Sequence, residues 1–326
     1  MVISTFDRSA FLGALLDALV AQTMDSSCFE VVFVDNGSHD DTWEKVKAET
    51  SRTPLRMLGM RLEVNSGAGS GRNAGIEASR APVIAFTDDD CVPTPGWLEA
   101  LTRPLLASGL DERPELVIQG RTHPWPADAE GAGAWARTVW VLRPTWLFET
   151  CNIAYRRTDL GHAGGFLHGD DAPKAATRRA FGEDAELGWR VVSSGAELLF
   201  TPEAVVEHRH IAASYTDWLI EQCRRGDFPG LVARHTLGRK ALWHRWFLAS
   251  RTAAFDVGVI CGLVGILTRR SRWLVGWAPW LWLALPEASQ RGGRHPAIRL
   301  AQIGLGDLVG MSSLLAGSAR ARSVVL

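Results

Sequence analysis

Apolar and polar positions in the first part of the chain follow strand and helix periods in turn. Short apolar runs at 1–5, 29–34 and 83–87 predict buried strands. Between them, residues 11–21 carry apolar side chains at helical spacing, and a glycine-rich loop leads into a helical pattern at 72–78. This alternation predicts an α/β fold in which a mainly parallel sheet is flanked by helices.

The pattern continues and then changes near residue 212. Strand-like runs recur at 115–120, 150–155 and 198–201, and residues 183–192 have helical spacing. From about residue 212 the chain is helical in pattern, basic and rich in tryptophan. We therefore expect an α/β domain over 1–215 and a helical extension over 216–326.

Charge is unevenly divided between these two parts. The whole chain has a net charge of −1, but residues 219–326 hold 15 Arg and Lys against 5 Asp and Glu. Acidic clusters suit metal ions, a basic apolar tail suits an anionic surface, and the overall balance points to no nucleic-acid partner. The five cysteines form no CxxC pair, which indicates neither a zinc site nor a disulfide framework. We expect no signal peptide, because no basic stretch precedes an apolar one at the start.

Three consecutive carboxylates, Asp88, Asp89 and Asp90, follow the strand predicted at 83–87. Like charges this close repel one another unless a cation compensates them. Mg²⁺ and Mn²⁺ favour oxygen ligands and often bridge a carboxylate to a substrate diphosphate. The triplet therefore indicates a divalent-cation site, although a solvated acidic turn has the same sequence.

Two further polar segments follow predicted strands. Residues 35–38 read Asp-Asn-Gly-Ser, which is typical of a turn and also offers Asp35 to a base or a ribose. The glycine-rich residues 65–75 allow close backbone approach, and the helix that follows has an N-terminus that favours an anion. Arg72 on that helix is placed to pair with a phosphate. Ligands in such folds gather at the carboxyl ends of the strands.

Glu183 and Asp184 stand at the start of the helical pattern at 183–192. Acidic residues are ordinary at a helix N-terminus, where they stabilise the first turn. A carboxylate there can also act as the general base that deprotonates an acceptor hydroxyl. The residues alone leave both interpretations open.

Taken together, these segments resemble the family 2 glycosyltransferases, which are inverting enzymes with the GT-A fold. The pieces occur in the order and spacing of that family and cover roughly residues 1–210. The matching pieces are 2–8, 34–42, 65–75, 86–93, 150–157 and 182–184. The resemblance implies a metal-dependent hexosyltransferase that moves a sugar from a nucleotide-diphosphate sugar to an acceptor hydroxyl with inversion. It also implies that residues 1–215 form the catalytic domain, with a donor half at about 1–95 and an acceptor half at about 96–215.

The resemblance also implies roles for individual residues. Asp184 would be the catalytic base with Glu183 beside it, and Asp35 would contact the nucleobase. Asp88 and Asp90 form the family's Asp-x-Asp motif, with Asp90 on a Mg²⁺ or Mn²⁺ ion. The predicted donor set is Thr5, Asp7, Arg8, Asp35, Asn65, Gly67, Arg72, Asn73, Asp88 and Asp89; the metal set is Asp88, Asp90 and His208; and the acceptor set is Asn152, Trp146 and Arg225.

Several features bear on the alternatives. Gly226 stands where the Gln-x-x-Arg-Trp motif of processive polysaccharide synthases has its tryptophan, which favours nonprocessive transfer over a synthase subunit. A noncatalytic scaffold on the same fold would lack the Asp triplet or Asp184. A nucleotidyltransferase would need a glycine-rich loop directly after the first strand. His208 either completes the metal site or is a core or surface histidine.

The extension carries two apolar runs, at 252–268 and 273–285, separated by Arg269-Arg270-Ser-Arg272. Each run falls short of the ~20 residues of a transmembrane helix, and Trp and Arg at the edges suit a membrane interface. We expect a peripheral anchor on the cytoplasmic face of the inner membrane. It would bring the site to a saccharide, lipid-linked or small-molecule acceptor in cell-envelope, glycolipid or natural-product glycosylation. A helical hairpin that enters the bilayer and packing against protein are the alternatives.

Overall fold

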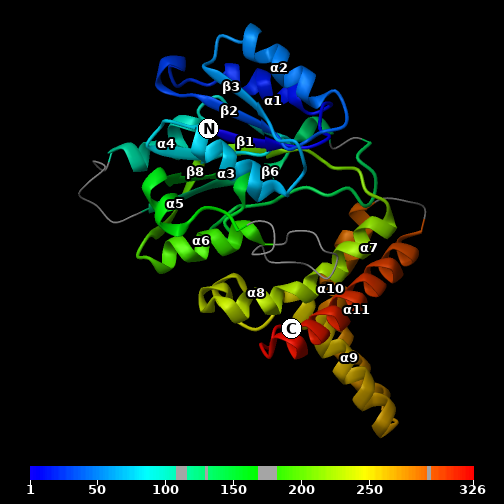
Figure 1. Cartoon of the computed structure of the whole chain (residues 1–326). Coiled ribbons are helices and arrows are strands. Elements are labelled where there is room, and N and C mark those ends of the chain that lie inside the picture. Colours follow the sequence, from blue (N-terminus) through cyan, green and yellow to red (C-terminus); the bar gives the residue numbers. More distant parts are fainter. Residues whose placement is uncertain (108–115, 129–130, 168–181, 292–294) are drawn as a thin grey trace. The chain divides into compact units, whose positions relative to one another are not determined.

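The computed structural model describes residues 1–107, 116–128, 131–167, 182–291 and 295–326. These residues form two compact units (Figure 1). The first unit takes in the described parts of Met1–Glu130, Thr138–Pro173 and Gly182–His210, and the second takes in Gly131–Arg137 and the described parts of Ile211–Leu326. The domain boundary at 215 and the division into donor and acceptor halves stay predictions.

A parallel array forms one half of the sheet in the first unit. Its elements are β1 (Val2–Thr5), α1 (Leu12–Val20), β2 (Val31–Asp35), α2 (Thr42–Arg52), β3 (Met57–Arg61), α3 (Ala68–Ala78) and β4 (Val83–Phe86). The strands lie in the order β3-β2-β1-β4, and each neighbouring pair is parallel. The register places Thr5 beside Asp35 and Asp35 beside Arg61. The carboxyl ends of these strands therefore meet at one edge of the sheet.

Antiparallel pairing enters the sheet beyond β4. The remaining elements are β5 (Cys91–Pro93), α4 (Trp97–Ala107), β6 (Leu116–Pro124), η3 (Thr150–Asn152), β7 (Ile153–Arg156), α5 (Arg157–Ala163), α6 (Glu183–Ser193) and β8 (Glu197–His208), with short 3-10 turns η1 (Ser26–Cys28) and η2 (Pro126–Asp128). Strand β7 is antiparallel to β4 and β6, whereas β8 is parallel to β6 and antiparallel to β5. The sheet is mixed overall, and the parallel arrangement holds for β1–β4.

The two faces of the sheet bury alternate side chains of the parallel strands. Ile3 and Phe33 belong to a buried cluster that includes Trp97 of α4. On the other face, a Cβ added at Gly75 of α3 would run into Val2. Because side chains alternate between the faces of a strand, this spacing gives one hydrophobic layer on each side of the sheet.

Glycine lets α3 lie directly on β1. A Cβ at Gly71 would collide with Ser4 Oγ, just as one at Gly75 would meet Val2. The two glycines are four residues apart, so they share one face of the helix. This close approach holds Arg72 of α3 at the carboxyl edge of the sheet.

The second unit is helical. Its elements are α7 (Tyr215–Arg224), η4 (Arg225–Asp227), α8 (Phe228–Arg234), η5 (Thr236–Ala241), α9 (Ser250–Thr268), η6 (Ser271–Trp277), α10 (Ala278–Gln290) and α11 (Pro296–Ala321). Helix α11 packs through glycines, because a Cβ at Gly306 would meet the Trp218 ring and one at Gly310 would meet Arg225. The helical pattern expected after residue 212 is therefore observed.

Two helices of this unit are long and apolar, and only one of them contains a predicted apolar run. Helix α9 has 19 residues and α11 has 26, and both are long and apolar enough to cross a membrane by length and composition alone. The run predicted at 252–268 lies in α9, and the run at 273–285 is divided between η6 and α10. The apolar length of α11 was not anticipated, because glycine and serine interrupt its leucines.

Asn152 ties three elements of the first unit together. Trp97 Nε1 of α4 donates to Asn152 Oδ1 (2.9 Å). Asn152 Nδ2 donates to Arg121 O of β6 (2.7 Å) and to Ala204 O of β8 (2.8 Å). The side chain is 1% exposed, so these partners have no water to replace the amide.

We predict that Asn152→Ala lowers the free energy of unfolding by about 3 kcal/mol, because it leaves one buried donor and two buried carbonyls unsatisfied. Urea unfolding of Asn152→Ala, Trp97→Phe and the double variant forms a thermodynamic cycle. We expect a coupling energy of about 1 kcal/mol from the lost hydrogen bond. Strictly additive effects would show that the two side chains do not interact.

Candidate active site

A buried guanidinium connects three carboxylates at the carboxyl edge of the sheet. Arg72 Nη1 donates to Asp184 Oδ1 (3.0 Å), and Nη2 donates to Asp88 Oδ1 (2.8 Å). Glu183 Oε1 lies 4.0 Å from Nη1. Arg72 is 7% exposed and rests on the Phe166 ring. One positive charge thus faces three negative ones, which leaves an electrostatic demand for a further cation.

Asp184 is held through both of its carboxylate oxygens. While Oδ1 pairs with Arg72, Oδ2 accepts from the backbone N–H (3.2 Å) and the hydroxyl (2.9 Å) of Thr150. Burial raises the pKa of Asp184 to about 7, against the lowering effect of Arg72. Its side chain keeps 27% of its surface exposed. A carboxylate with this pKa that a hydroxyl can reach is suited to general base catalysis near neutral pH.

The start of α6 explains how Asp184 reaches this place. Gly182 precedes the helix with a φ of 70°, in the left-handed region that glycine adopts without strain. Glu183, Asp184 and Glu186 then occupy the first turn, where the helix dipole favours negative charge. The capping interpretation and the general-base interpretation of these residues are therefore compatible.

The three aspartates after β4 have different surroundings. Asp88 pairs with Arg72, whereas Asp90 lies 3.3 Å from His208 Nε2 and 3.9 Å from Arg8 Nη2. Asp89 is 7% exposed. Burial first, and then repulsion from Asp90, raise the pKa of Asp89 to about 7. Burial also raises the pKa of Asp90, and the neighbouring His208 opposes this effect.

Asp90 and His208 form a pair that suits a divalent cation. Asp90, Cys91 and His208 each offer one ligand atom, and these atoms lie within 4.8 Å of one another. His208 Nδ1 lies 2.8 Å from Arg209 O, an arrangement that fixes the ring and leaves Nε2 as the ligand. Burial raises the pKa of the Cys91 thiol well above its usual value, and hard cations prefer oxygen. Asp90 and His208 therefore fit the ion, while Cys91 belongs to the core.

Two further predicted donor residues lie at the ends of β1 and β2. Asp35 is fully buried, with Oδ2 3.2 Å from Arg61 Nε and Oδ1 accepting from the backbone N–H of Ser38 (3.2 Å). Asp7 accepts from the backbone N–H of His39 (2.6 Å) and has a φ of 52°. Both carboxylates are held by neighbouring backbone at the edge where a nucleoside would lie.

Hydrogen bonds from asparagine side chains hold the predicted glycine-rich loop and the helix that follows it. Asn36 Nδ2 donates to Asn65 Oδ1 (3.0 Å) and to Gly67 O (2.9 Å). Gly67 has a φ of 93°, which only glycine adopts readily. Asn73 makes reciprocal hydrogen bonds of 2.8 Å with the backbone of Phe166. Asn73 thus holds the segment on which Arg72 rests, and its contact with a donor stays a prediction.

The predicted acceptor residues belong to different units: Asn152 and Trp146 to the first, and Arg225 to the second. The side chain of Asn152 is engaged in hydrogen bonds with Trp97, Arg121 and Ala204. Trp146 has a φ of 61°, and its carbonyl accepts from Trp189 Nε1 (2.8 Å). Arg225 lies in the second unit, 3.8 Å from Asp307. Roles for these residues toward an acceptor stay predictions, and part of the predicted acceptor half at about 96–215 lies outside the described residues.

Sequence reasoning missed four residues of the site. Thr150 and Glu149 precede β7, and Glu149 accepts from Gln119 Nε2 (2.7 Å) and from Thr145 Oγ1 (2.6 Å). Burial raises the pKa of Glu149. Asn36 and Arg61 were equally overlooked. Arg61 had a detectable signal, because it ends the strand next to the one that Asp35 ends, whereas nothing in the sequence pairs Thr150 with Asp184.

Comparisons with known proteins identify a sequence family and relatives of this chain. Residues 1–123 match the sequence model of glycosyl transferase family 2. The chain is 34% identical over 112 residues to glycosyltransferase AglE of Haloferax volcanii. The aligned residues make up 34% of this chain and 36% of that protein. It is 26% identical over 237 residues to validoxylamine A glucosyltransferase of Streptomyces hygroscopicus subsp. jinggangensis. This alignment covers 63% of this chain and 53% of that protein. The chain thus spans about a third to a half of these relatives' lengths.

The fold is also similar to that of a solved structure. The mannosyltransferase PcManGT from Pyrobaculum calidifontis, in complex with GDP-Man and Mn²⁺, matches with a TM-score of 0.55 at 17% identity, over 98% of this chain and 86% of that chain. At this identity the likeness concerns the fold. The GT-A fold and the family resemblance predicted from the motifs are both confirmed.

The raised pKa of Asp89 predicts how stability depends on pH. The unfolded chain releases this proton near pH 3.8, whereas the folded protein holds it to about pH 7. The stabilisation is therefore complete below the unfolded pKa and is lost as the pH rises through about 7. In EDTA, we expect the urea midpoint to fall between about pH 5.5 and about pH 7.5. Asp89→Asn reduces this fall, while Asp17→Asn, at an exposed site on α1, preserves it. An equal fall in both variants contradicts the assignment.

Proposed function

We propose that this chain, whose residues 1–123 belong to glycosyl transferase family 2, moves a sugar from a nucleotide-diphosphate sugar to an acceptor hydroxyl. One observation carries the proposal. Arg72 joins Asp184, a carboxylate suited to a general base, to Asp88 of the triplet whose Asp90 faces His208. A base and a cation-binding pair at one edge are what glycosyl transfer from a diphosphate requires.

The residues divide the reaction between them. Asp184 accepts the proton of the acceptor hydroxyl as its oxygen attacks C1 of the sugar from the side opposite the diphosphate, so the anomeric configuration inverts. Thr150 and Arg72 hold the two oxygens of Asp184 and limit the directions from which a hydroxyl can approach. Arg72 is also within reach of negative charge that develops on the leaving group.

Asp90 and His208 would hold the divalent cation, with Asp88 near it. When bound, Mg²⁺ or Mn²⁺ stabilises negative charge on the departing diphosphate. The carboxylates support this assignment, because burial raises the pKa of Asp89 and Asp90 and a bound cation would favour their ionised forms. The Mn²⁺ in the structurally similar PcManGT is consistent with it.

Nonprocessive transfer is the form of the reaction that we propose. Gly226 takes the place of the tryptophan of processive synthases, and its carbonyl lies where a Cβ on Gly317 of α11 would stand. The similarity to a validoxylamine A glucosyltransferase supports a small-molecule or natural-product acceptor, while cell-envelope glycan and glycolipid acceptors fit the family equally well. We also propose peripheral membrane association of residues 216–326 at the cytoplasmic face, supported by the two apolar helices of that unit.

Substitutions can test the role of Asp184 as the base separately from the role of Asp90 and His208 in holding the cation. We predict that Asp184→Asn preserves donor binding but lowers the transfer rate by about 10²- to 10⁴-fold, because only the proton acceptor is lost. Glu183→Gln serves as the matched control and has a smaller effect. Initial rates and donor titrations across a panel of UDP-, GDP- and TDP-sugars, with Mn²⁺, measure both. Transfer at the wild-type rate by Asp184→Asn would assign the base elsewhere.

Mn²⁺ binding tests the metal pair without a known donor. We expect Asp90→Asn and His208→Ala each to weaken Mn²⁺ binding by roughly tenfold or more in the presence of a nucleoside diphosphate, because each removes one ligand. Electron paramagnetic resonance of free Mn²⁺ reports the bound fraction. Asp17→Asn is the control. Undiminished binding by both site variants would place the ion elsewhere, and no binding by folded wild type would favour the noncatalytic scaffold.

A further inference from the structure

One face of α9 exposes a continuous apolar stripe. Ile260, Leu263 and Leu267 are 60%, 56% and 82% exposed, and their spacing of three and four residues places them on one side of the helix. The opposite side is covered by η6, because Gly258 and Gly262 both face the Trp277 ring. Helix α9 and η6 together form a hairpin, Ser250–Trp277, whose outer face is hydrocarbon.

Further large apolar side chains are exposed on the elements that follow α9. Leu274 and Val275 of η6 are 59% and 74% exposed, and Trp282 of α10 is 80% exposed. Soluble proteins rarely display contiguous apolar side chains on this scale unless a partner or a membrane covers them. Trp282 has the amphipathic ring that favours the boundary between water and lipid.

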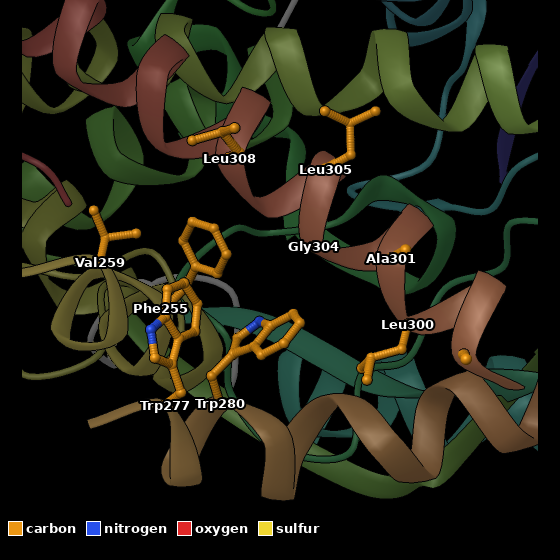
Figure 2. A pocket seen from close by; sticks show the side chains of 10 residues that line it. Phe255, Val259, Trp277, Trp280, Leu300, Ala301, Gly304, Leu305 and Leu308 are labelled. Atoms are coloured by element: carbon orange, nitrogen blue, oxygen red, sulfur yellow. The ribbon is translucent and has the colours of Figure 1, made fainter. Parts of the chain in front are cut away.

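The hairpin also lines an apolar pocket together with α10 and α11 (Figure 2). Phe255 and Trp277 stand on one side of it, and Leu300 and Leu308 of α11 stand on the other, around a volume of about 490 Å³. The indole nitrogen of Trp280, which also lines the pocket, donates to Asp307 (2.9 Å). The lining residues therefore offer carbon to a ligand, which suits hydrocarbon and not sugar.

A basic corner adjoins the stripe where α9 ends. Arg269, Arg270 and Arg272 are all exposed and form no ion pair within the described part of the chain. The sequence has no Asp or Glu between Asp256 and Glu287. Uncompensated arginines beside exposed leucines are complementary to a surface that is both anionic and apolar.

We propose that the α9–η6 hairpin lies in the plane of an anionic lipid bilayer. The Ile260–Leu267 stripe enters the acyl region, and Arg269, Arg270 and Arg272 bind lipid phosphates. A position in the plane fits better than a span, because one side of α9 is already covered by η6 and the arginines stand at the tip of the hairpin, which a span would carry through the hydrocarbon. This inference specifies the proposed membrane association and is independent of glycosyl transfer.

Vesicle sedimentation of the full chain tests the charge. We expect binding to vesicles with equal phosphatidylcholine and phosphatidylglycerol and little binding to phosphatidylcholine alone. Replacing all three arginines by Gln should lower the partition coefficient of the chain onto the mixed vesicles by about 100-fold. The matched Arg→Lys triple variant should retain binding. Equal binding to both vesicle types, or by the Gln variant, would overturn the proposal.

A second pair of variants tests the stripe. Leu263→Asn with Leu267→Asn should weaken binding to the mixed vesicles by at least about tenfold, because two apolar side chains no longer enter the acyl region. Leu58→Asn with Leu142→Asn, at exposed positions of the first unit, is the matched control and should bind as wild type does. Equal loss in both pairs would overturn the role of the stripe.

Other occupants of this surface give different outcomes, and each contradicts the proposal. Resistance of the bound wild-type chain to extraction by high salt and alkaline carbonate would indicate a span. A concentration-dependent dimer that does not bind vesicles would indicate that a second copy of the chain covers this surface. Donor and Mn²⁺ binding measured without lipid should be the same in the Gln variant and in wild type, so a failure of the proposed transferase activity is distinguishable from a failure of this inference.

Discussion

The mutual repulsion of carboxylates at one edge of a sheet is the constraint on which the rest of the first unit depends. Asp88, Glu183 and Asp184 come from segments far apart in the chain, and a single buried guanidinium holds them together. Arg72 supplies one positive charge to three negative ones, so the protein can assemble this edge but cannot neutralise it. Burial first, and repulsion between neighbouring carboxylates second, raise the pKa of Asp89 and Asp90, and such an edge suits a cation and its diphosphate.

The fold serves this arrangement through small, local means. Gly71 and Gly75 bring α3 onto β1 closely enough to place Arg72 at the edge, and Gly182 turns the chain so that α6 begins with Asp184. Parallel strands β1–β4 deliver their carboxyl ends to the same side, where Asp35 and the triplet follow. The second unit follows different chemistry, since its exposed surface is apolar and basic where the site is buried and acidic.

Much of the first unit was predictable because its signals are local. The alternation of strand and helix, the triplet after β4 and the family motifs identified the fold and the segments of the site. The hydrogen bonds of Thr150 to Asp184 and the buried position of Asn152 were not predictable, because they depend on the pairing of β6 with β7 and β8, which no local pattern encodes. Arg225 illustrates the same limit, because sequence similarity to a motif did not reveal that it packs beside α11 near Asp307.

Anomalous diffraction from a crystal of the full chain with Mn²⁺ and a nucleoside diphosphate, recorded at the manganese edge, would locate the cation. We expect one strong peak within bonding distance of Asp90 and His208 Nε2, with the diphosphate between that peak and Arg72. A peak elsewhere, or a diphosphate bound away from this edge with no ion beside Asp90, would show that these carboxylates do not form the donor site.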